Sequence, residues 1–469
     1  VVLAISVRSV LRLRLEQLVL DEPELDIRLT AAGQWQIAGL ELPKTQQGDN
    51  AAADWLFSQN EVLIRGGTLR WTNERAHLPL KALSRSGTPI VTATTPPTPE
   101  ASTLALRDVD LILRNSARHH DMRLDATPPE GWGERFVSMG RFKRSLLSNH
   151  AGQFSDWSGQ VYAYFPQVDV SQLHQHVQLG ADIQSGQGSL RVWSDFENGQ
   201  WTGGAADTDL KALNIRFDPQ YPPLAFDRLS GRLAARVQPT GFEVSTRQLS
   251  FVSAEGLHWP GGNLTLAYTH EQAQTRKPAQ GHLQADHLDL EALRDLSLRL
   301  PLPAELHRPL QAQQVTGLIE SMQLSWQGPW QTPQNYEAQA RVQDLNLPAQ
   351  PLQDGSSSTA PAWPGLRGAQ VQLKMNQAGG QIQLDMNHDG AVILPGLLEE
   401  PAVPVDNLHA QARWQRKDGR WDIPQWSLQL SNPDLQGQWQ GQWHASAQEG
   451  EAGVIDLQGD RKSTRLNSS

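Results

Sequence analysis

Histidine is the residue type in this chain that is best suited to metal chemistry, because imidazole nitrogens bind zinc when three or four ligands converge. Of the 14 histidines, the ones close enough together to suggest a metal site are His119-His120, His174-x-His176 and, further apart, His282 and His287. Residues two apart on a strand share a face, but no carboxylate or third histidine accompanies either pair at a useful spacing. We interpret both pairs as surface or turn residues. His282 and His287 fall on different faces of a probable strand, which disfavours a metal site there.

Carboxylates and glycine-rich motifs could support hydrolysis or nucleotide binding. Paired acids occur at Glu399-Glu400 and at Asp108 and Asp110, but the acids scatter along polar faces, which favours solvated charges over a catalytic pair. Gly186-Gln187-Gly188 lacks a third glycine and a βαβ context, so it does not indicate a dinucleotide site. No G-x-S-x-G, P-loop or H-E-x-x-H motif and no cysteine occurs. The sequence therefore predicts neither catalysis nor a cofactor.

Composition further narrows the classes of protein to which the chain could belong. The 469 residues carry a net charge of −10, which argues against a nucleic-acid partner. Only 38% of them are apolar, a low share for a closed core, whereas 16 Trp, 30 Pro and 38 Gly suit many strands separated by turns. No apolar run reaches the length of about 18 residues that a spanning helix needs. The chain also begins without Met or a signal peptide, so we expect a missing targeting or anchoring segment.

Alternation of apolar and polar residues predicts the strands that position these side chains. In the stretch 55–71, two apolar runs flank Gly66-Gly67, and Leu69 and Trp71 share a face. The segment 106–115 alternates again, with its acids opposite its apolar residues. A Leu-x-Gly or Leu-x-Ala unit recurs near 229, 366 and 408, which suggests a quasi-one-dimensional repeat.

These patterns predict a mainly β fold: an elongated, curved antiparallel sheet that forms an open hydrophobic groove. Short helices are expected at 55–60, 169–178 and 289–298, the last ended by Pro301. The residues expected to line the groove share an apolar face of their strands. They are Leu11, Leu13, Leu15, Leu69, Trp71, Val109, Leu111, Leu113, Leu190, Val192, Leu264, Leu266, Trp439 and Trp443.

Composition also predicts how the chain is divided. Residues 1–43 form N-terminal groove strands, 44–54 a linker, and 55–350 the main groove with an insertion at 87–103. A loop at 351–365 precedes further groove repeats at 366–460. Residues 44–53, 87–103, 351–365 and 461–469 are expected to be loops, because their Pro, Ser, Thr and Gly content buries little apolar surface. The ending RKSTRLNSS breaks the alternation and is expected to be non-native.

Several passages resemble a known family. They are PELDIRLTAAGQWQIAGL (23–40), WLFSQNEVLIRGGTLRW (55–71), LDATPPEGWGERFVSMGRF (124–142), WSGQVYAYFPQVDVSQL (157–173), GQGSLRVW (186–193) and LSGRL (229–233). On these residues the chain resembles the YhdP proteins of the AsmA-like superfamily, which are periplasmic proteins of Gram-negative bacteria. The resemblance extends over most of residues 10–445, and its motifs are structural.

The resemblance implies a protein anchored to the inner membrane by one N-terminal helix, which this sequence lacks. The rest would be a β-groove that carries phospholipid across the periplasm to the outer membrane or its proteins. A lipid conduit needs no active site. Two alternatives stay open: a periplasmic enzyme acting on polysaccharide, and an outer-membrane assembly or structural factor without lipid cargo.

Overall fold

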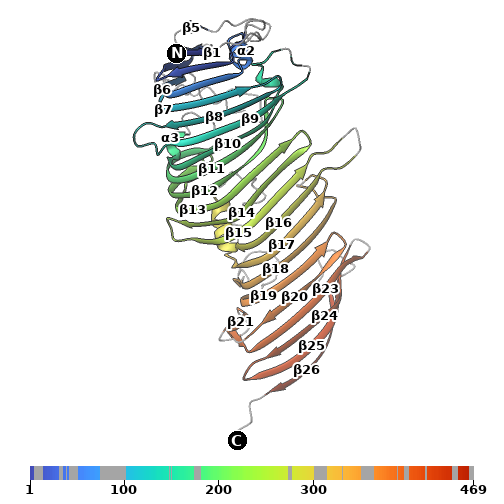
Figure 1. Ribbon diagram of the computed structural model, residues 1–469. Helices are drawn as coiled ribbons and strands as arrows, with labels where there is room; N and C mark the ends of the chain where they lie inside the picture. The colour runs from blue at the N-terminus through green and yellow to red at the C-terminus, as the bar shows by residue number, and fades with distance from the viewer. Residues whose placement is uncertain are drawn as a thin grey trace, which may run out of the picture. The chain divides into compact units, whose positions relative to one another are not determined.

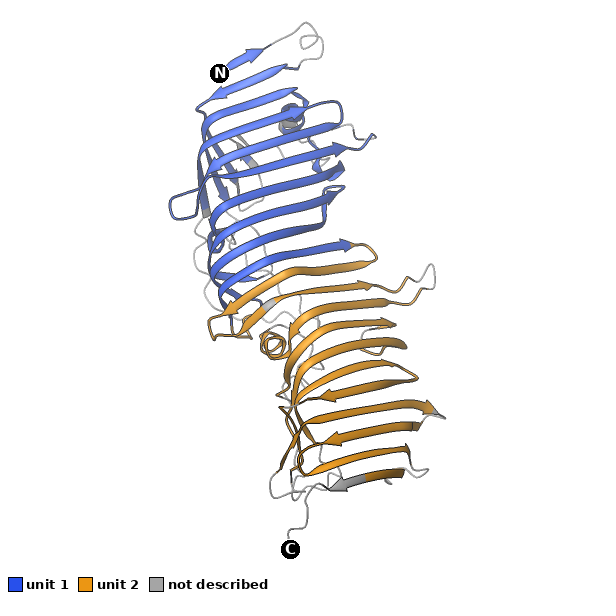
Figure 2. Cartoon of the chain, turned by 60° about the horizontal axis from the view of Figure 1, so that its bottom comes forward, with its two compact units in different colours: residues 1–217, 223–237 blue, residues 218–222, 238–469 orange. Residues whose placement is uncertain are grey.

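The computed structural model describes residues 1–4, 14–30, 35–37, 40–41, 51–73, 102–146, 148, 150–173, 181–272, 277–299, 314–329, 331–349, 364–387, 389–395, 401–417, 420–445 and 453–463. Strands account for 73% of these residues, so the predicted mainly β class is confirmed. Contacts divide the chain into two units, residues 1–217 with 223–237 and residues 218–222 with 238–469 (Figure 2). The boundary falls inside the span 55–350 that sequence patterns treat as one segment.

Unit 1 is built from strands that follow one another along the chain (Figure 1). They are β1 (Val2–Ala4), β2 (Gln17–Asp21), β3 (Glu24–Leu29), β4 (Trp35–Ile37), β5 (Leu40–Glu41), β6 (Glu61–Asn73), β7 (Ser102–Asn115), β8 (His119–Thr127), β9 (Phe136–Arg144), β10 (Trp157–Asp169), β11 (Asp182–Glu197), β12 (Gln200–Arg216) and β13 (Leu224–Gln238). From β6 to β13 each strand pairs antiparallel with the next. On its other side β6 runs parallel to β2 and β3.

Unit 2 repeats the antiparallel order. Its strands are β14 (Gly241–Ser253), β15 (His258–Thr269), β16 (Gln280–Asp289), β17 (Thr316–Gln327), β18 (Asn335–Leu347), β19 (Gly365–Asn376), β20 (Gly379–Met386), β21 (Gly390–Ile393), β22 (Ala402–Val405), β23 (Asn407–Lys417), β24 (Arg420–Ser431), β25 (Leu435–His444) and β26 (Val454–Ser463). One part of β19 pairs with β20 and another with β21. The sheet then continues from β20 through β23 to β26.

Each described unit is essentially one layer of sheet. The strands with extensive mutual contacts are sheet neighbours. The helices are α2 (Ala51–Ser58), α3 (Val170–Leu173), α4 (Leu290–Ser297) and the 3-10 turn η1 (Phe154–Asp156). Helix α3 packs on β11, and α4 packs on β16 and β17. The α-helices overlap the predicted segments 55–60, 169–178 and 289–298, although α2 begins earlier and residues 174–178 lie outside the described chain, whereas η1 was not predicted. Asp289 caps α4 by accepting a hydrogen bond from the backbone N–H of Ala292 at 2.8 Å.

A repeated bulge bends the strands. A residue with φ near +50° occurs inside β7, β12, β16 and β18, and it is not glycine: Asp108 (φ 48°), Ala212 (49°), His287 (50°) and Asp344 (49°). In each case an apolar residue follows, then Asp or Asn, then Leu or Ile. The left-handed backbone adds a residue to one strand, which bends that strand and shifts its alternation by one position. Strands of both units curve strongly in Figure 2.

Side chains on the neighbouring strand hold several bulges in place. The backbone N–H of Gly66 donates to Asp110 Oδ1 at 3.0 Å, that of Gln248 to Asn263 Oδ1 at 2.9 Å, and that of Gly368 to Asn346 Oδ1 at 3.0 Å. A bulge leaves a backbone donor outside the strand ladder, and an unpaired donor is costly. These Asp and Asn side chains therefore stabilise the bend itself.

The predicted loops need small corrections. Helix α2 includes residues 51–53, which were expected to belong to a linker, and Ala53 packs against the hydrophobic cluster of Phe57, Val62, Leu113 and Trp157. Ser102 and Thr103 begin β7, and Gly365 begins β19. Residues 461–463 pair with β25 as the end of β26, although a loop was expected. The remaining residues of the predicted loops lie outside the described chain.

The bulge in β12 predicts the effect of a substitution at Ala212. A left-handed backbone costs an alanine roughly 1 kcal/mol relative to glycine, so Ala212→Gly should raise the free energy of unfolding by about 0.5–1 kcal/mol. Urea unfolding followed by tryptophan fluorescence would measure the change. The control is Ala205→Gly in the extended part of β12, which should be destabilising. Destabilisation by both substitutions would contradict a left-handed residue 212.

Candidate functional site

One face of unit 1 carries a continuous row of small and apolar side chains. Cross-strand partners point to the same side of a sheet, so the row follows from the strand register. It runs Ile64, Leu111, Leu124, Ser138, Ala163, Val192, Ala206 and Leu233, from β6 to β13. We call this side the apolar face. Leu190 lies on it because it is two residues from Val192.

The bulges keep further predicted residues on the same side. Val109 and Leu113 flank Leu111 at two-residue spacing. Leu69 packs against the cluster of Leu106, Val109 and Ala126, and Trp71 pairs with Leu104 in the adjoining segment. Leu15 lies just before β2, where its backbone N–H donates to Gln59 Oε1 at 2.7 Å. Leu11 and Leu13 lie outside the described residues.

Unit 2 has an equivalent apolar face. Its row runs Leu264, Ala285, Met322, Ala340, Leu373, Ile382, Ala412, Trp426, Gly441 and Leu457, from β15 to β26. At about 4.8 Å per strand, the row is roughly 40 Å long. Leu266, Trp439 and Trp443 lie on this face at even spacings from members of the row.

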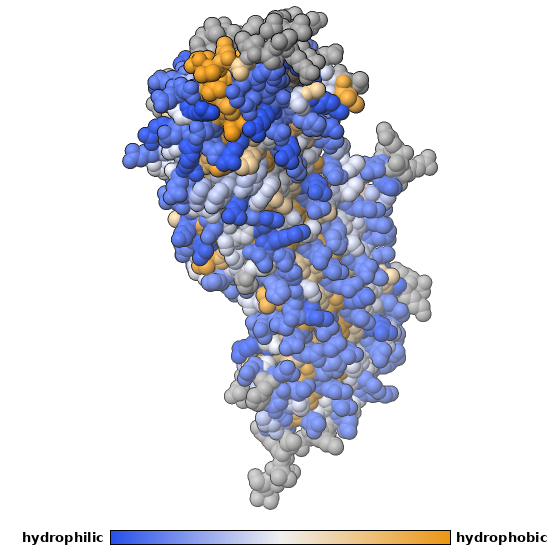
Figure 3. Space-filling view, viewed as in Figure 1, coloured by the Kyte–Doolittle hydropathy of each residue, from blue (hydrophilic) through white to orange (hydrophobic). Residues whose placement is uncertain are grey.

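Most side chains of these rows are half-buried, and a few are exposed. Leu233 is 38% exposed and Val244, which neighbours Leu266, is 42% exposed. Next to the bulges the same face closes into small cores: Val109, Leu213 and Leu288 are 4%, 5% and 1% exposed. The bend therefore divides the apolar face into a buried strip and an open strip. In the view of Figure 3 the surface is largely hydrophilic, with hydrophobic residues showing between polar ones.

Tryptophan rings lie flat on the open strip of unit 2 because glycines face them. A Cβ added at Gly281 would fall 1.9 Å from the Trp326 ring, one at Gly380 2.5 Å from Trp414, and one at Gly459 2.2 Å from Trp439. In each pair the glycine is the cross-strand partner of the tryptophan. The rings therefore add apolar area without standing up from the sheet. These glycines were missed from sequence, since the pairing needs the register.

A buried aromatic cluster closes one end of the apolar face of unit 1. Phe57 of α2 packs edge-on against Trp157, with ring centroids 4.7 Å apart. The His120 ring stacks on the Trp157 indole at 4.2 Å and also meets Phe57 edge-on at 5.5 Å, and its Nδ1 lies 2.8 Å from Asn115 Oδ1. Contrary to the predicted surface role, His120 is only 1% exposed. Burial lowers the pKa of its imidazole to about 4, and the nearby charge of Arg144 adds to the effect.

The opposite face of unit 1 is covered by ion pairs. Arg232 contacts Asp207 at 2.5 Å, Arg228 contacts Asp209 at 3.1 Å, and similar pairs are Arg114–Glu61, Arg123–Asp125 and Arg141–Asp121. The guanidinium of Arg232 holds the pKa of the Asp207 carboxyl below its ordinary value. Asp110, expected to be a solvated charge, contacts Arg135 at 2.7 Å as well as the Gly66 N–H.

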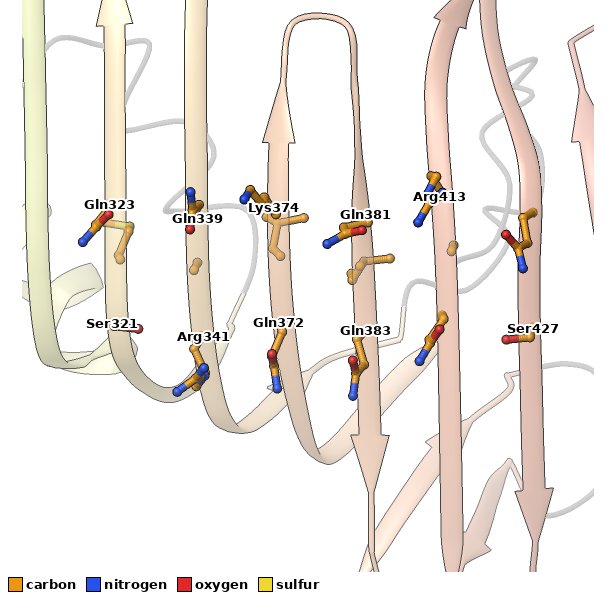
Figure 4. Close-up of a pocket in the computed structure, with 17 residues that line it drawn as sticks. Ser321, Gln323, Gln339, Arg341, Gln372, Lys374, Gln381, Gln383, Arg413 and Ser427 are labelled. Atoms are coloured by element: carbon orange, nitrogen blue, oxygen red, sulfur yellow. The ribbon is translucent and has the colours of Figure 1, made fainter.

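The opposite face of unit 2 contains an open hollow of about 470 Å³ (Figure 4). Polar side chains of β17 to β24 line it in two rows. One row is Gln323, Gln339, Lys374, Gln381, Arg413 and Gln425, and the other is Ser321, Arg341, Gln372, Gln383, Gln411 and Ser427. Met322, Ala340, Leu373, Ile382 and Ala412 of the apolar row contribute to the lining between these two rows. Among the described residues, neither a carboxylate nor an aromatic ring lines the hollow.

The positions of the His, Asp and Glu side chains give little support for a metal site or a hydrolytic site. Within the described ranges, no group of three or more His, Asp or Glu side chains could hold a metal ion. His174 and His176 lie outside those ranges. Asp121 and Asp195 line one hollow of about 430 Å³ in unit 1, but three strand spacings separate them. That is about 14 Å, beyond the roughly 9.5 Å limit for a glycosidase pair.

Each unit is thus an open, single-layer, mostly antiparallel sheet with an apolar face, as the AsmA-like class of proteins would have. The chain belongs to the YhdP family within that class, because the family model described as YhdP protein matches residues 2–468. The YhdP family is a family of lipid-transport proteins. The match includes most of the ending 461–469, which sequence patterns had set apart as non-native.

No curated protein and no solved structure matches the chain. Among the described residues, none of the helices combines the length and the apolar character that a membrane crossing requires.

The buried His120 predicts a pH dependence of stability. Between pH 6.5 and 4 the unfolded chain binds a proton at this histidine and the folded chain does not, so the free energy of unfolding falls as the pH falls. The loss approaches about 3 kcal/mol at pH 4. Urea unfolding at pH 7.5 and 5 would measure it. His120→Phe keeps a ring on Trp157 but has no proton to bind, so its stability should change less with pH. If the free energy of unfolding changed equally with pH in the two proteins, this account would be contradicted.

Proposed function

We propose that the chain is a non-enzymatic phospholipid conduit, in which the open strip of the apolar face holds the acyl chains. The observation that carries this proposal is the half-exposed apolar row across consecutive strands of each unit, from β6 to β13 and from β15 to β26. Monomeric soluble proteins rarely leave large contiguous apolar patches exposed, and such patches mark binding sites. A continuous row offers one acyl chain many equivalent positions along the sheet.

The energetics favour a lipid as the occupant. Each CH₂ group of an acyl chain costs about 0.8 kcal/mol in water, so a chain can cross an aqueous space only along a continuous apolar surface. The flat indoles of Trp326, Trp414 and Trp439 extend that surface and leave room above it. The opposite face, with its charges and amides, keeps the sheet in contact with water. The groove-lining residues predicted from sequence are proposed to contact the lipid.

Family membership supports a periplasmic location, with transfer of phospholipid between the inner and outer membranes. Anchoring to the inner membrane and contact with the outer membrane or its proteins are part of the same proposal. An assembly or structural factor without lipid cargo is the alternative, and a polysaccharide-acting enzyme is a weaker one. Lipid extraction from the purified chain, followed by mass spectrometry, distinguishes them. Stoichiometric phospholipid is expected, and a lipid-free chain that takes up no phospholipid from vesicles would overturn the conduit.

A substitution in the middle of the row tests the path in unit 1. Leu111 is half-buried between Ile64 and Leu124. In Leu111→Asp the carboxylate can stay hydrated, so the fold should survive. A charge among acyl chains costs on the order of 2–3 kcal/mol, so phospholipid binding should fall about tenfold or more. Thermal unfolding and bound phospholipid would be measured together.

The matched control for this substitution is Ile112→Asp. Ile112 is the next residue of β7, is also half-buried, and points to the opposite face. Asp110 is less suitable as a control because it holds the Gly66 bulge. Lipid binding should be retained in Ile112→Asp. Unfolding of Leu111→Asp would favour a closed core, and full lipid occupancy in it would remove this face from the path.

A further inference from the structure

The hollow on the opposite face of unit 2 has no role in a conduit for acyl chains. Its two rows of polar side chains point away from the apolar face, because successive residues of a strand alternate between faces. Its amide, hydroxyl and cationic groups suit a hydrated ligand instead. We propose that this hollow binds a strand of acidic polysaccharide.

The cations of the hollow differ from five of the arginines on the same side of unit 1, which are paired with carboxylates. In unit 1, Arg114, Arg123, Arg141, Arg228 and Arg232 each meet a carboxylate within 3.1 Å. In the hollow, Lys374 and Arg413 have no carboxylate partner among the described residues, and Arg341 lies 3.8 Å from Glu320. Three cations therefore gather where no acid lines the surface, in a chain of net charge −10.

Four amides of the hollow are also available. Among the described residues, the side chains of Gln323, Gln372, Gln381 and Gln425 have no hydrogen-bond partner. Each amide offers two donors and an acceptor, which is the complement of a ring hydroxyl. Gln339, by contrast, donates to Glu337 Oε1 at 3.1 Å at the edge of the hollow. Gln383 and Gln411 are likewise engaged, with Asp385 and His409. The four free amides are therefore spread over β17, β19, β20 and β24, where they could bind hydroxyl groups of one ligand.

The spacing of the cations favours a polymer over a single small ion. Lys374 and Arg413 occupy the same row two strands apart, which places them about 10 Å from each other. Both side chains are long enough to converge on one small anion, but the row continues for about 24 Å from β17 to β24, and only a polymer can contact its whole length. The absence of an aromatic ring from the lining disfavours stacked bases and therefore a nucleic acid. Charge complementarity and hydroxyl-binding amides together select an acidic polysaccharide.

Binding of the full chain to polygalacturonate, measured by affinity electrophoresis in low salt, tests the proposal. The double variant Lys374→Gln with Arg413→Gln should raise the dissociation constant at least about tenfold, because two charge-assisted contacts are lost. The matched control is Lys143→Gln with Lys211→Gln, which removes the same charge from exposed sites in unit 1. The control should bind as the unchanged chain does. Circular dichroism would verify that all variants fold.

The contribution of the amides to binding is tested with a second pair of substitutions. Gln372→Ala with Gln381→Ala should weaken binding to polygalacturonate but leave binding to inorganic polyphosphate unchanged, since polyphosphate offers no hydroxyl groups. Dextran, which is neutral, should bind more weakly than polygalacturonate. The proposal is overturned if polygalacturonate does not bind saturably, or if the control variant loses as much affinity. It is also overturned if polyphosphate binds equally well and the amide variant binds both polymers normally. Phospholipid binding by the apolar face does not enter any of these outcomes.

Discussion

The bend in each strand is the constraint on which the rest of this structure depends. A flat strand would expose its apolar side along its whole length, and a closed barrel would hide it. Here a left-handed residue such as Asp108 or His287 bends the strand, and the next residue, Val109 or Leu288, becomes buried. The bend thus creates a core strip for stability and leaves an open strip for binding.

Hydrogen bonds make that bend a stable feature of the backbone. The side chains of Asp110, Asn263 and Asn346 each accept the bulge N–H of a neighbouring strand. Because an orphaned backbone donor costs on the order of 1–3 kcal/mol, loss of such a side chain affects the neighbour's bend as well as its own strand. The bend therefore propagates from strand to strand within a unit.

Local periodicity was sufficient to predict the strands and the shared face of Val109, Leu111 and Leu113, because side-chain direction depends only on neighbouring residues. The bulges escaped prediction because their left-handed residues are Asp, Ala and His, none of which marks such a backbone as glycine does. A pattern of apolar residue, Asp or Asn, and Leu or Ile after each bulge was present but unrecognised. The burial of His120 and the glycine partners of the tryptophans depend on register and on α2. Those features and the polar hollow depend on contacts between residues far apart in sequence, which local periodicity does not reveal.

Because successive residues of a strand point to opposite faces of the sheet, one face can be apolar while the other is polar. Leu373 belongs to the apolar row, while Gln372 and Lys374 on either side of it line the polar hollow. An exposed ion pair contributes at most about 1 kcal/mol, so leaving Lys374 and Arg413 unpaired costs the fold little. Stability therefore does not dictate whether cations on this face are paired, and unpaired cations occur among the described residues of both units, at Lys143 as well as at Lys374 and Arg413. The proposed recognition of an external anion would use the cations of the hollow, on the face opposite the proposed lipid path.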